Sequence, residues 1–215
     1  MFSQSFLERC AGLAVCTWSD ALDQMHIGAV LEGITQRSGT GRFAGRAVTV
    51  KEIVGDLGAY PKGDFAVGRL CDAVQPGDVL VVEMGGAAVS TIGGNAAWAL
   101  KRGGAAAAVI DGGCRDLAEI DKTGLWVASR HLTPITGKTR VKVEALGVQV
   151  VVGGAIINSG DLIIGDDSGI VVVPAMRSSE VLETAELCAR IDEKLESGLR
   201  AGMSFGDAAR EANYL

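Results

Sequence analysis

Near-continuous apolar runs alternate with helical patterns in the middle of the chain. DVLVVEM (78–84) and the segment 105–110 lack the alternation of a half-exposed strand and are typical of strands buried on both faces of a sheet. The segments 95–102 and 116–122 have helical patterns, and LWVAS (125–129) predicts a third strand. The resulting β–α–β–α–β order predicts an α/β fold with parallel pairing.

The N-terminal third predicts helices on either side of one strand. Apolar positions in QSFLERCAGLAV recur at helical spacing, and Ser19 has the residue type of an N-cap for a short helix, DALDQM. GRAVTVKEI is rich in β-formers and predicts a strand over residues 46–53. Asp64 is a candidate N-cap for a helix over FAVGRLCDAV.

The pattern changes in the second half. Short β segments separated by glycine-containing turns predict a strand-rich, partly antiparallel region over 141–173; they are VKVEAL, VQVVV, LIIG and GIVVVP. A long amphipathic helix follows over about 178–199, which either folds back on the core or reaches a neighbouring subunit. We expect one domain over 1–215, with 175–215 as a helical extension.

Composition narrows the class of protein. The chain has 215 residues and is 48% hydrophobic, which is ample material for one core. Its net charge of −6, without a Lys/Arg cluster, argues against a nucleic-acid partner. We expect no membrane association, because no apolar run is long enough to span a bilayer and Glu8 and Arg9 interrupt any signal-peptide pattern. A cytoplasmic protein is therefore expected.

The cysteines and histidines limit the possible metal chemistry. The five cysteines form no CxxC pair, and there are two histidines, so neither a disulfide framework nor a multi-histidine site is expected. A bound metal would be held by carboxylates and water, which favours a hard ion such as Mg²⁺.

The candidate site lies at the two ends of one helix–strand unit. Gly93 and Gly94 precede the helix, where N–H groups without intrahelical partners attract anions. Arg115 and Asp116 follow the next strand, and parallel strands bring such ends to the same sheet edge. We expect a small 2-oxo acid here, its carboxylate on Arg115 and the amides and its keto oxygen on a cation held by Asp116.

Simpler interpretations are open for these residues. The Gly-Gly pair is often only a turn, and Arg-Asp is often a helix start with a solvated arginine. Asp111 either orients Arg115 or a water, or forms a turn before Gly-Gly. Glu119 lies one helical turn after Asp116, so it either approaches the cation or remains solvated.

The order of several motifs resembles that of the RraA-like family, which includes 4-hydroxy-4-methyl-2-oxoglutarate/4-carboxy-4-hydroxy-2-oxoadipate aldolases. The resemblance covers most of the chain, and its motifs are WSDALDQM, FAGRAVTVK, QPGDVLVVE, VIDGGCRD, TPITGK and NSGDLIIGDDSGIVVVP. It implies a layered α/β/β core with parallel βαβ units. It also implies a homotrimer, or a hexamer of two trimers, with sites at subunit boundaries.

The resemblance also assigns roles to residues. Asp116 would be the direct ligand of Mg²⁺ or Mn²⁺, with Glu119 in the family's later acidic position. Arg115 would bind the pyruvyl carboxylate, assisted by four backbone amides, those of Gly93, Gly94, Asn95 and Ala96. The implied reaction is cleavage of a 4-hydroxy-2-oxo diacid to pyruvate through an enolate, with oxaloacetate decarboxylation as a companion activity. Glu193 is a candidate for an acidic residue contributed to a neighbour's site.

One position departs from the family pattern. The residue separated from Arg115 by twenty others is Gly94, where aldolases of the family usually have Asp or Glu. Glycine does no acid–base chemistry. Another residue substitutes for that carboxylate, or the chain catalyses a different metal-dependent reaction on a related acid, or it is a non-catalytic regulator of the ribonuclease-binding type.

Overall fold

A mixed sheet of nine strands organises the part of the chain that the computed structural model describes, residues 2–28 and 30–214. The strand order is β1-β6-β5-β3-β2-β10-β11, with β4 beside β5 and β7 beside β2. Strands β2, β3, β5 and β6 pair in parallel, whereas β1, β7, β10 and β11 pair antiparallel. The strands are β1 (Thr35–Ser38), β2 (Phe43–Val54), β3 (Asp78–Glu83), β4 (Ser90–Ile92), β5 (Ala107–Cys114), β6 (Trp126–Leu132), β7 (Val141–Leu146), β10 (Leu162–Asp166) and β11 (Gly169–Val173), and a separate hairpin joins β8 (Val150–Val152) to β9 (Ala155–Ile157).

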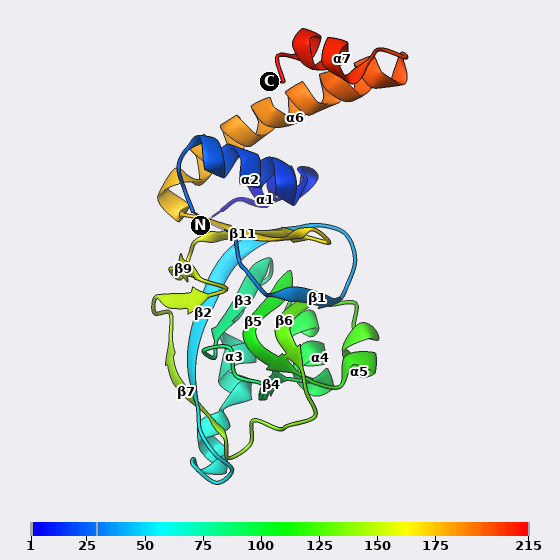
Figure 1. Cartoon of the computed structure of the whole chain (residues 1–215). Coiled ribbons are helices and arrows are strands. Elements are labelled where there is room, and N and C mark those ends of the chain that lie inside the picture. Colours follow the sequence, from blue (N-terminus) through cyan, green and yellow to red (C-terminus); the bar gives the residue numbers. More distant parts are fainter. Residues whose placement is uncertain (1, 29, 215) are drawn as a thin grey trace.

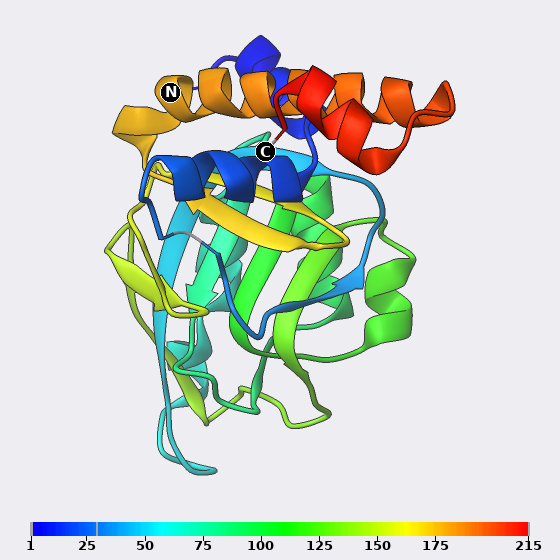
Figure 2. The same cartoon turned by 45° about the horizontal axis from the view of Figure 1, so that its top comes forward.

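Helices cover both faces of this sheet (Figures 1 and 2). Because successive strand residues point to opposite faces, Val79 and Val81 enter one core while Leu80 and Val82 enter the other. The first core is closed by α1 (Gln4–Gly12), α2 (Val15–Gln24) and α6 (Ser178–Arg200), and the second by α3 (Val67–Ala73), α4 (Gly94–Arg102) and α5 (Leu117–Asp121). Short 3₁₀ turns are η1 (Lys62–Phe65) and η2 (Ala175–Arg177).

The fold class predicted from the sequence is confirmed, and the buried strands and the long C-terminal helix lie where the pattern predicted them. Two capping predictions are wrong. Ser19 lies inside α2, which already begins at Val15, because the Val15 amide donates to the Asp166 carboxylate (3.0 Å) from a distant strand. Asp64 lies in the η1 turn, and α3 begins only after Ala66.

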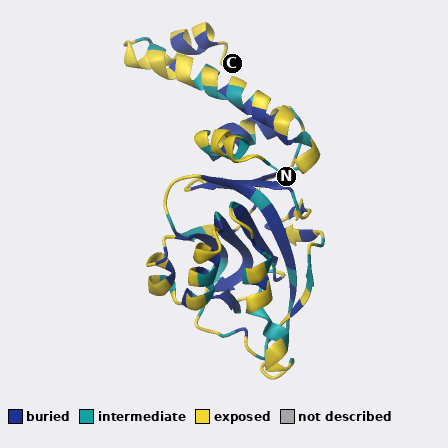
Figure 3. Cartoon of the chain, turned by 180° about the vertical axis from the view of Figure 1, so that it is seen from behind, coloured by how far each residue is buried: buried dark blue, intermediate teal, exposed yellow. Residues whose placement is uncertain are grey.

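The C-terminal helices extend away from the sheet (Figure 3). The first half of α6 packs on the main core through Val181, Leu182 and Ala185. Its far end instead forms a small separate cluster with α7 (Phe205–Ala212), a helix that was not predicted as a separate element. The outer part of α6 is therefore held mainly by α7.

No helix among the described residues combines the length and the apolar character that crossing a bilayer requires.

The packing of α4 leads to a stability prediction. Leu100 is completely buried on the face of α4 that meets the sheet, so Leu100→Ala should lower the free energy of unfolding by about 2–5 kcal/mol. Urea unfolding measures this loss. Leu187→Ala is the control, because Leu187 is half exposed on α6 and its truncation should cost far less. Equal losses for the two variants would contradict this placement of α4.

Candidate functional site

A cleft of about 270 Å³ lies where the N-terminus of α4 meets the end of β5. The sheet explains this meeting, because β3, β4, β5 and β6 run parallel and their carboxyl ends share one edge. The cleft is lined by Phe65, Val67, Ser90, Thr91, Gly93, Asn95, Ala96, Arg115, Asp116, Thr136 and Lys138. The structure thus brings together most of the residues that the sequence singled out, while their roles stay predictions.

Asp116 presents its carboxylate to the cleft. It precedes α5 as the N-cap residue, but it has a left-handed backbone (φ 56°) and its side chain makes no capping bond. The Oδ2 atom instead lies 3.4 Å from the backbone N of Gly94 and 3.4 Å from Arg115 Nε. A carboxylate that leaves the usual capping role, in a conformation that few residues adopt, is typical of a functional position.

The two glycines allow this close approach. A Cβ on Gly93 would lie 2.7 Å from Asp116 Oδ2 and 3.1 Å from Arg115 Cγ. A Cβ on Gly94 would lie 2.6 Å from Cβ of Glu119, an atom too near the backbone to move aside. Glycine at both positions therefore lets α4 pack directly against the Arg115–Asp116 turn and α5.

Two positively charged side chains flank the cleft. Arg115 is partly exposed there, and Lys138 lines the same cleft from the loop between β6 and β7. Spacing alone could not single out Lys138, because a lysine in a loop is usually solvated. Two cationic groups beside one carboxylate suit a small ligand with more than one negative charge.

Three other candidates from the sequence do not line the cleft. Both carboxylate oxygens of Glu119 are 2.8 Å from Lys122 Nζ, so its side chain is engaged on the exposed face of α5. Asp111 does not orient Arg115: its Oδ1 accepts from Arg130 Nε at 2.6 Å. Glu193 is exposed on the outer part of α6.

A buried carboxylate that the sequence analysis missed lies behind the cleft. Glu52 on β2 is 3% exposed, and its Oε1 accepts a hydrogen bond from Thr91 Oγ1 at 2.9 Å. Burial raises the pKa of Glu52 to about 7, and the Thr91 hydrogen bond partly opposes that shift. The period of two in β2 was an available signal, because it puts Glu52 on the same face as Val48 and Val50.

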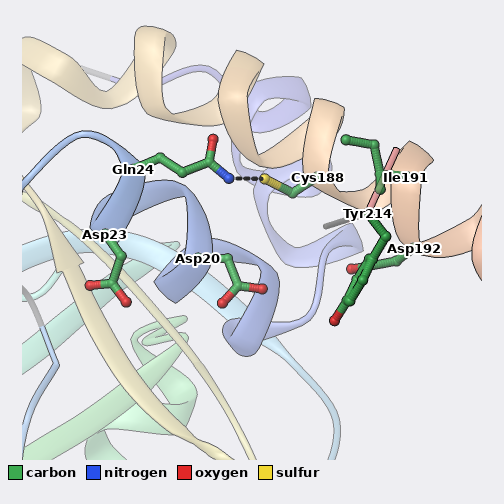
Figure 4. Close-up of a pocket in the computed structure, with 7 residues that line it drawn as sticks. All are labelled: Asp20, Asp23, Gln24, Cys188, Ile191, Asp192 and Tyr214. Carbon is green, nitrogen blue, oxygen red and sulfur yellow. Dashed lines mark hydrogen bonds between the residues drawn. The ribbon is translucent and has the colours of Figure 1, made fainter. Parts of the chain in front are cut away.

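A second hollow lies between α2, α6 and the C-terminal segment (Figure 4). Its carboxylates are Asp20, Asp23 and Asp192, and burial, followed by the charge of Asp20, raises the pKa of Asp192. Within residues 2–28 and 30–214, no three His, Cys, Asp or Glu side chains are grouped to hold a metal ion. The same is true of the cleft at Asp116, so the two sites differ in their cations: no lysine or arginine lines the second hollow, which makes it the weaker candidate for an anionic ligand.

Comparisons with known proteins place the sequence and the fold in one family. The family model described as RraA-like, Aldolase/RraA, matches residues 15–172. A protein of Halalkalibacterium halodurans with the provisional name 4-hydroxy-4-methyl-2-oxoglutarate aldolase is 28% identical, over 84% of this chain and 82% of its own. A crystal structure of an uncharacterized Pseudomonas syringae protein superposes with a TM-score of 0.88 at 28% identity, covering 98% of this chain and 95% of the other. RraAS2 of Streptomyces coelicolor, described as an unusual member of the RNase ES inhibitor RraA protein family, gives a TM-score of 0.82 at 27% identity, covering 93% and 100%.

The packing of Gly94 predicts an asymmetric response to alanine. Gly94→Ala should destabilise the protein by about 1–3 kcal/mol, because the new methyl group overlaps Glu119. Gly68→Ala is the matched control: this helical glycine on α3 has open space around it, so alanine should be neutral or stabilising. Thermal or urea unfolding of both variants measures the difference. When Glu119→Gly is also present, Gly94→Ala should lower the free energy of unfolding by less. An unchanged loss would refute the proposed overlap.

Glu52 predicts a pH dependence of stability. Its folded pKa lies above the ordinary glutamate value of 4.5, so its contribution to the free energy of unfolding is fully present below pH 4.5 and is lost as pH rises to about 7. The loss is up to about 3 kcal/mol. Glu52→Gln should remove this component, which urea unfolding of both proteins between pH 4.5 and 8 would measure. Parallel stability curves for the two proteins would show that Glu52 is not protonated in the folded state.

Proposed function

Because this chain belongs to the RraA-like family, we propose that it is a divalent-metal-dependent lyase that cleaves a 4-hydroxy-2-oxo diacid to pyruvate. The observation that carries the proposal is the single cleft that joins Arg115, Asp116 and the N-terminus of α4. The provisional aldolase names of relatives at 28% and 30% identity support the same reaction class. Oxaloacetate decarboxylation would use the same enolate chemistry.

The charges of the cleft favour a 2-oxo diacid as substrate. Arg115 has the planar fork that binds a carboxylate through two hydrogen bonds, and the first amides of α4, including those of Asn95 and Ala96, add the positive end of a helix dipole. Lys138 supplies a second positive charge for the distal carboxylate. A monocarboxylate would leave this lysine without a charged partner in the ligand.

Asp116 suits a hard divalent cation. Mg²⁺ usually keeps several waters and takes one or two carboxylates, and Asp116 offers one carboxylate that is 44% exposed at the cleft. When bound, Mg²⁺ or Mn²⁺ would supply positive charge beside the 2-oxo group and so favour the enolate. Glu119 would join only after leaving Lys122, so in this arrangement Asp116 alone is the proposed protein ligand.

Assembly is part of the same proposal. The family resemblance favours a homotrimer, or a hexamer of two trimers, in which α6 of one copy reaches the site of another. Glu193 is exposed on that helix and is the acidic group we propose for such a contact.

Gly94 is the observation that favours a second candidate function, a non-catalytic binding protein. The carboxylate expected there is missing, and the contact with Glu119 leaves no room for one. The Streptomyces coelicolor relative is described as a member of an RNase inhibitor family, which is a precedent for a binding role.

A pyruvate-release assay separates these functions. With Mg²⁺ and either oxaloacetate or 4-hydroxy-4-methyl-2-oxoglutarate, the wild type should release pyruvate, EDTA should stop the release, and added Mg²⁺ should restore it. Asp116→Ala should lower the rate by on the order of 10²–10³-fold, because the cation loses its protein ligand. Asp121→Ala, an exposed aspartate on the same helix, is the control and should leave the rate unchanged. No release from either substrate by the wild type would favour the binding role.

A further inference from the structure

Glu52 is placed where a carboxylate is costly to bury. Its side chain lies among the apolar residues of the second core, and its Oε2 atom is buried without a hydrogen-bond partner among the described residues. The partner of Glu52 on the neighbouring strand β7 is the buried Val143, whereas Lys142 and Glu144 on either side of Val143 are exposed. An unsatisfied carboxylate of this kind destabilises a fold, so a purely structural role would be served better by an apolar residue.

The alternation of β2 directs Glu52 toward the cleft side of the sheet. Lys51 and Glu52 pair with Ala145 and Val143 of β7, so the extra residue of the bulge is Glu144 on β7, and β2 keeps its alternation through Glu52. Glu52 then meets Thr91, which lines the same cleft as Arg115 and Asp116. One hydrogen bond of 2.9 Å therefore separates the buried carboxylate from a cleft-lining hydroxyl.

We propose that Glu52, acting through the Thr91 hydroxyl, is the proton acceptor and donor of the cleft and replaces the carboxylate that is missing at Gly94. This inference rests on the proposed lyase function. Glu52 is a positioning and relay residue, because Thr91 and not Glu52 borders the ligand space.

The proton transfers balance over one turnover. Thr91 accepts the proton of the substrate's 4-hydroxyl while its own proton passes to Glu52 Oε1; the C4–O bond becomes a carbonyl as the C3–C4 bond breaks. The electron pair of that bond forms the pyruvate enolate. Glu52 then returns the proton through Thr91, and it is delivered to C3 to form the methyl group of pyruvate. No oxidant or further reactant is needed.

The surroundings of Glu52 make its proton sensitive to the ligand. The charged groups of the cleft are Arg115, Asp116 and Lys138, and the remaining neighbours on β2 and β7 that share its face are apolar. Burial places the pKa of Glu52 at about 7, where a proton moves on and off with little cost. An anion entering the cleft should raise that pKa and draw a proton onto Glu52.

The first test follows the exchange of the methyl protons of pyruvate for deuterium by NMR, in D₂O with Mg²⁺. This exchange needs proton transfer at C3 but no carbon–carbon cleavage. Glu52→Gln and Thr91→Val should slow it by on the order of 100-fold with little change in KM, whereas Thr91→Ser keeps the hydroxyl and should retain most of the rate. Glu144→Gln, the same change at an exposed residue beside Val143, should leave it unaffected. Wild-type exchange rates in Glu52→Gln would overturn the inference.

The second test needs no turnover. Isothermal titration calorimetry of the Mg²⁺-loaded protein with oxalate, in two buffers of different ionisation enthalpy near pH 7, measures the protons taken up on binding. The wild type and Glu144→Gln should take up a fraction of a proton that Glu52→Gln does not. Equal uptake in Glu52→Gln, or none in the wild type, would overturn the role of Glu52. A wild type that releases no pyruvate but shows Glu52-dependent uptake would refute the lyase function and leave the coupling of Glu52 to the cleft intact.

Discussion

The contact between the start of α4 and the turn before α5 is the constraint on which the site depends. The side chains of Arg115, Asp116 and Glu119 occupy the space that a Cβ at Gly93 or Gly94 would take. This contact holds the carboxylate of Asp116 beside helix amides and beside its own neighbour, Arg115. A side chain at either glycine would separate the anion-binding helix end from the proposed metal ligand. The same packing explains why an acidic residue is absent at position 94.

Much of the fold followed from the sequence, because its signals are local. The run at 78–84 is buried on both faces, so its apolar character alone identified β3. The two glycines and the Arg115–Asp116 pair were placed at one edge of the sheet because the carboxyl ends of parallel strands meet there. Helix boundaries were harder. The start of α2 depends on a bond from Val15 to Asp166, which no local pattern reveals.

The candidate site was recognised only in part, for a similar reason. Glu52 and Thr91 are 39 positions apart and meet only once the sheet has formed and β4 has joined β5. The engagement of Glu119 by Lys122 and of Asp111 by Arg130 depends on rotamers and packing, which residue spacing does not determine. Sequence spacing located the backbone of the site better than the partners of its carboxylates.

The bond between Val15 and Asp166 has a consequence for the order in which the chain acquires structure. The amide at the start of α2 is satisfied by a residue 151 positions later, and β2 pairs with β10, whose residues follow their partners by 116–122 positions. A ribosome adding 5–20 residues per second would need roughly 8–30 s to supply that partner. During this interval the β10–β11 hairpin, on which α1 and α2 pack, has not yet been made, so the apolar faces of the two helices stay open to other chains. The N-terminal segment is thus made first but completed late, and the interval before β11 emerges is when a growing chain is most exposed to chaperones and to aggregation.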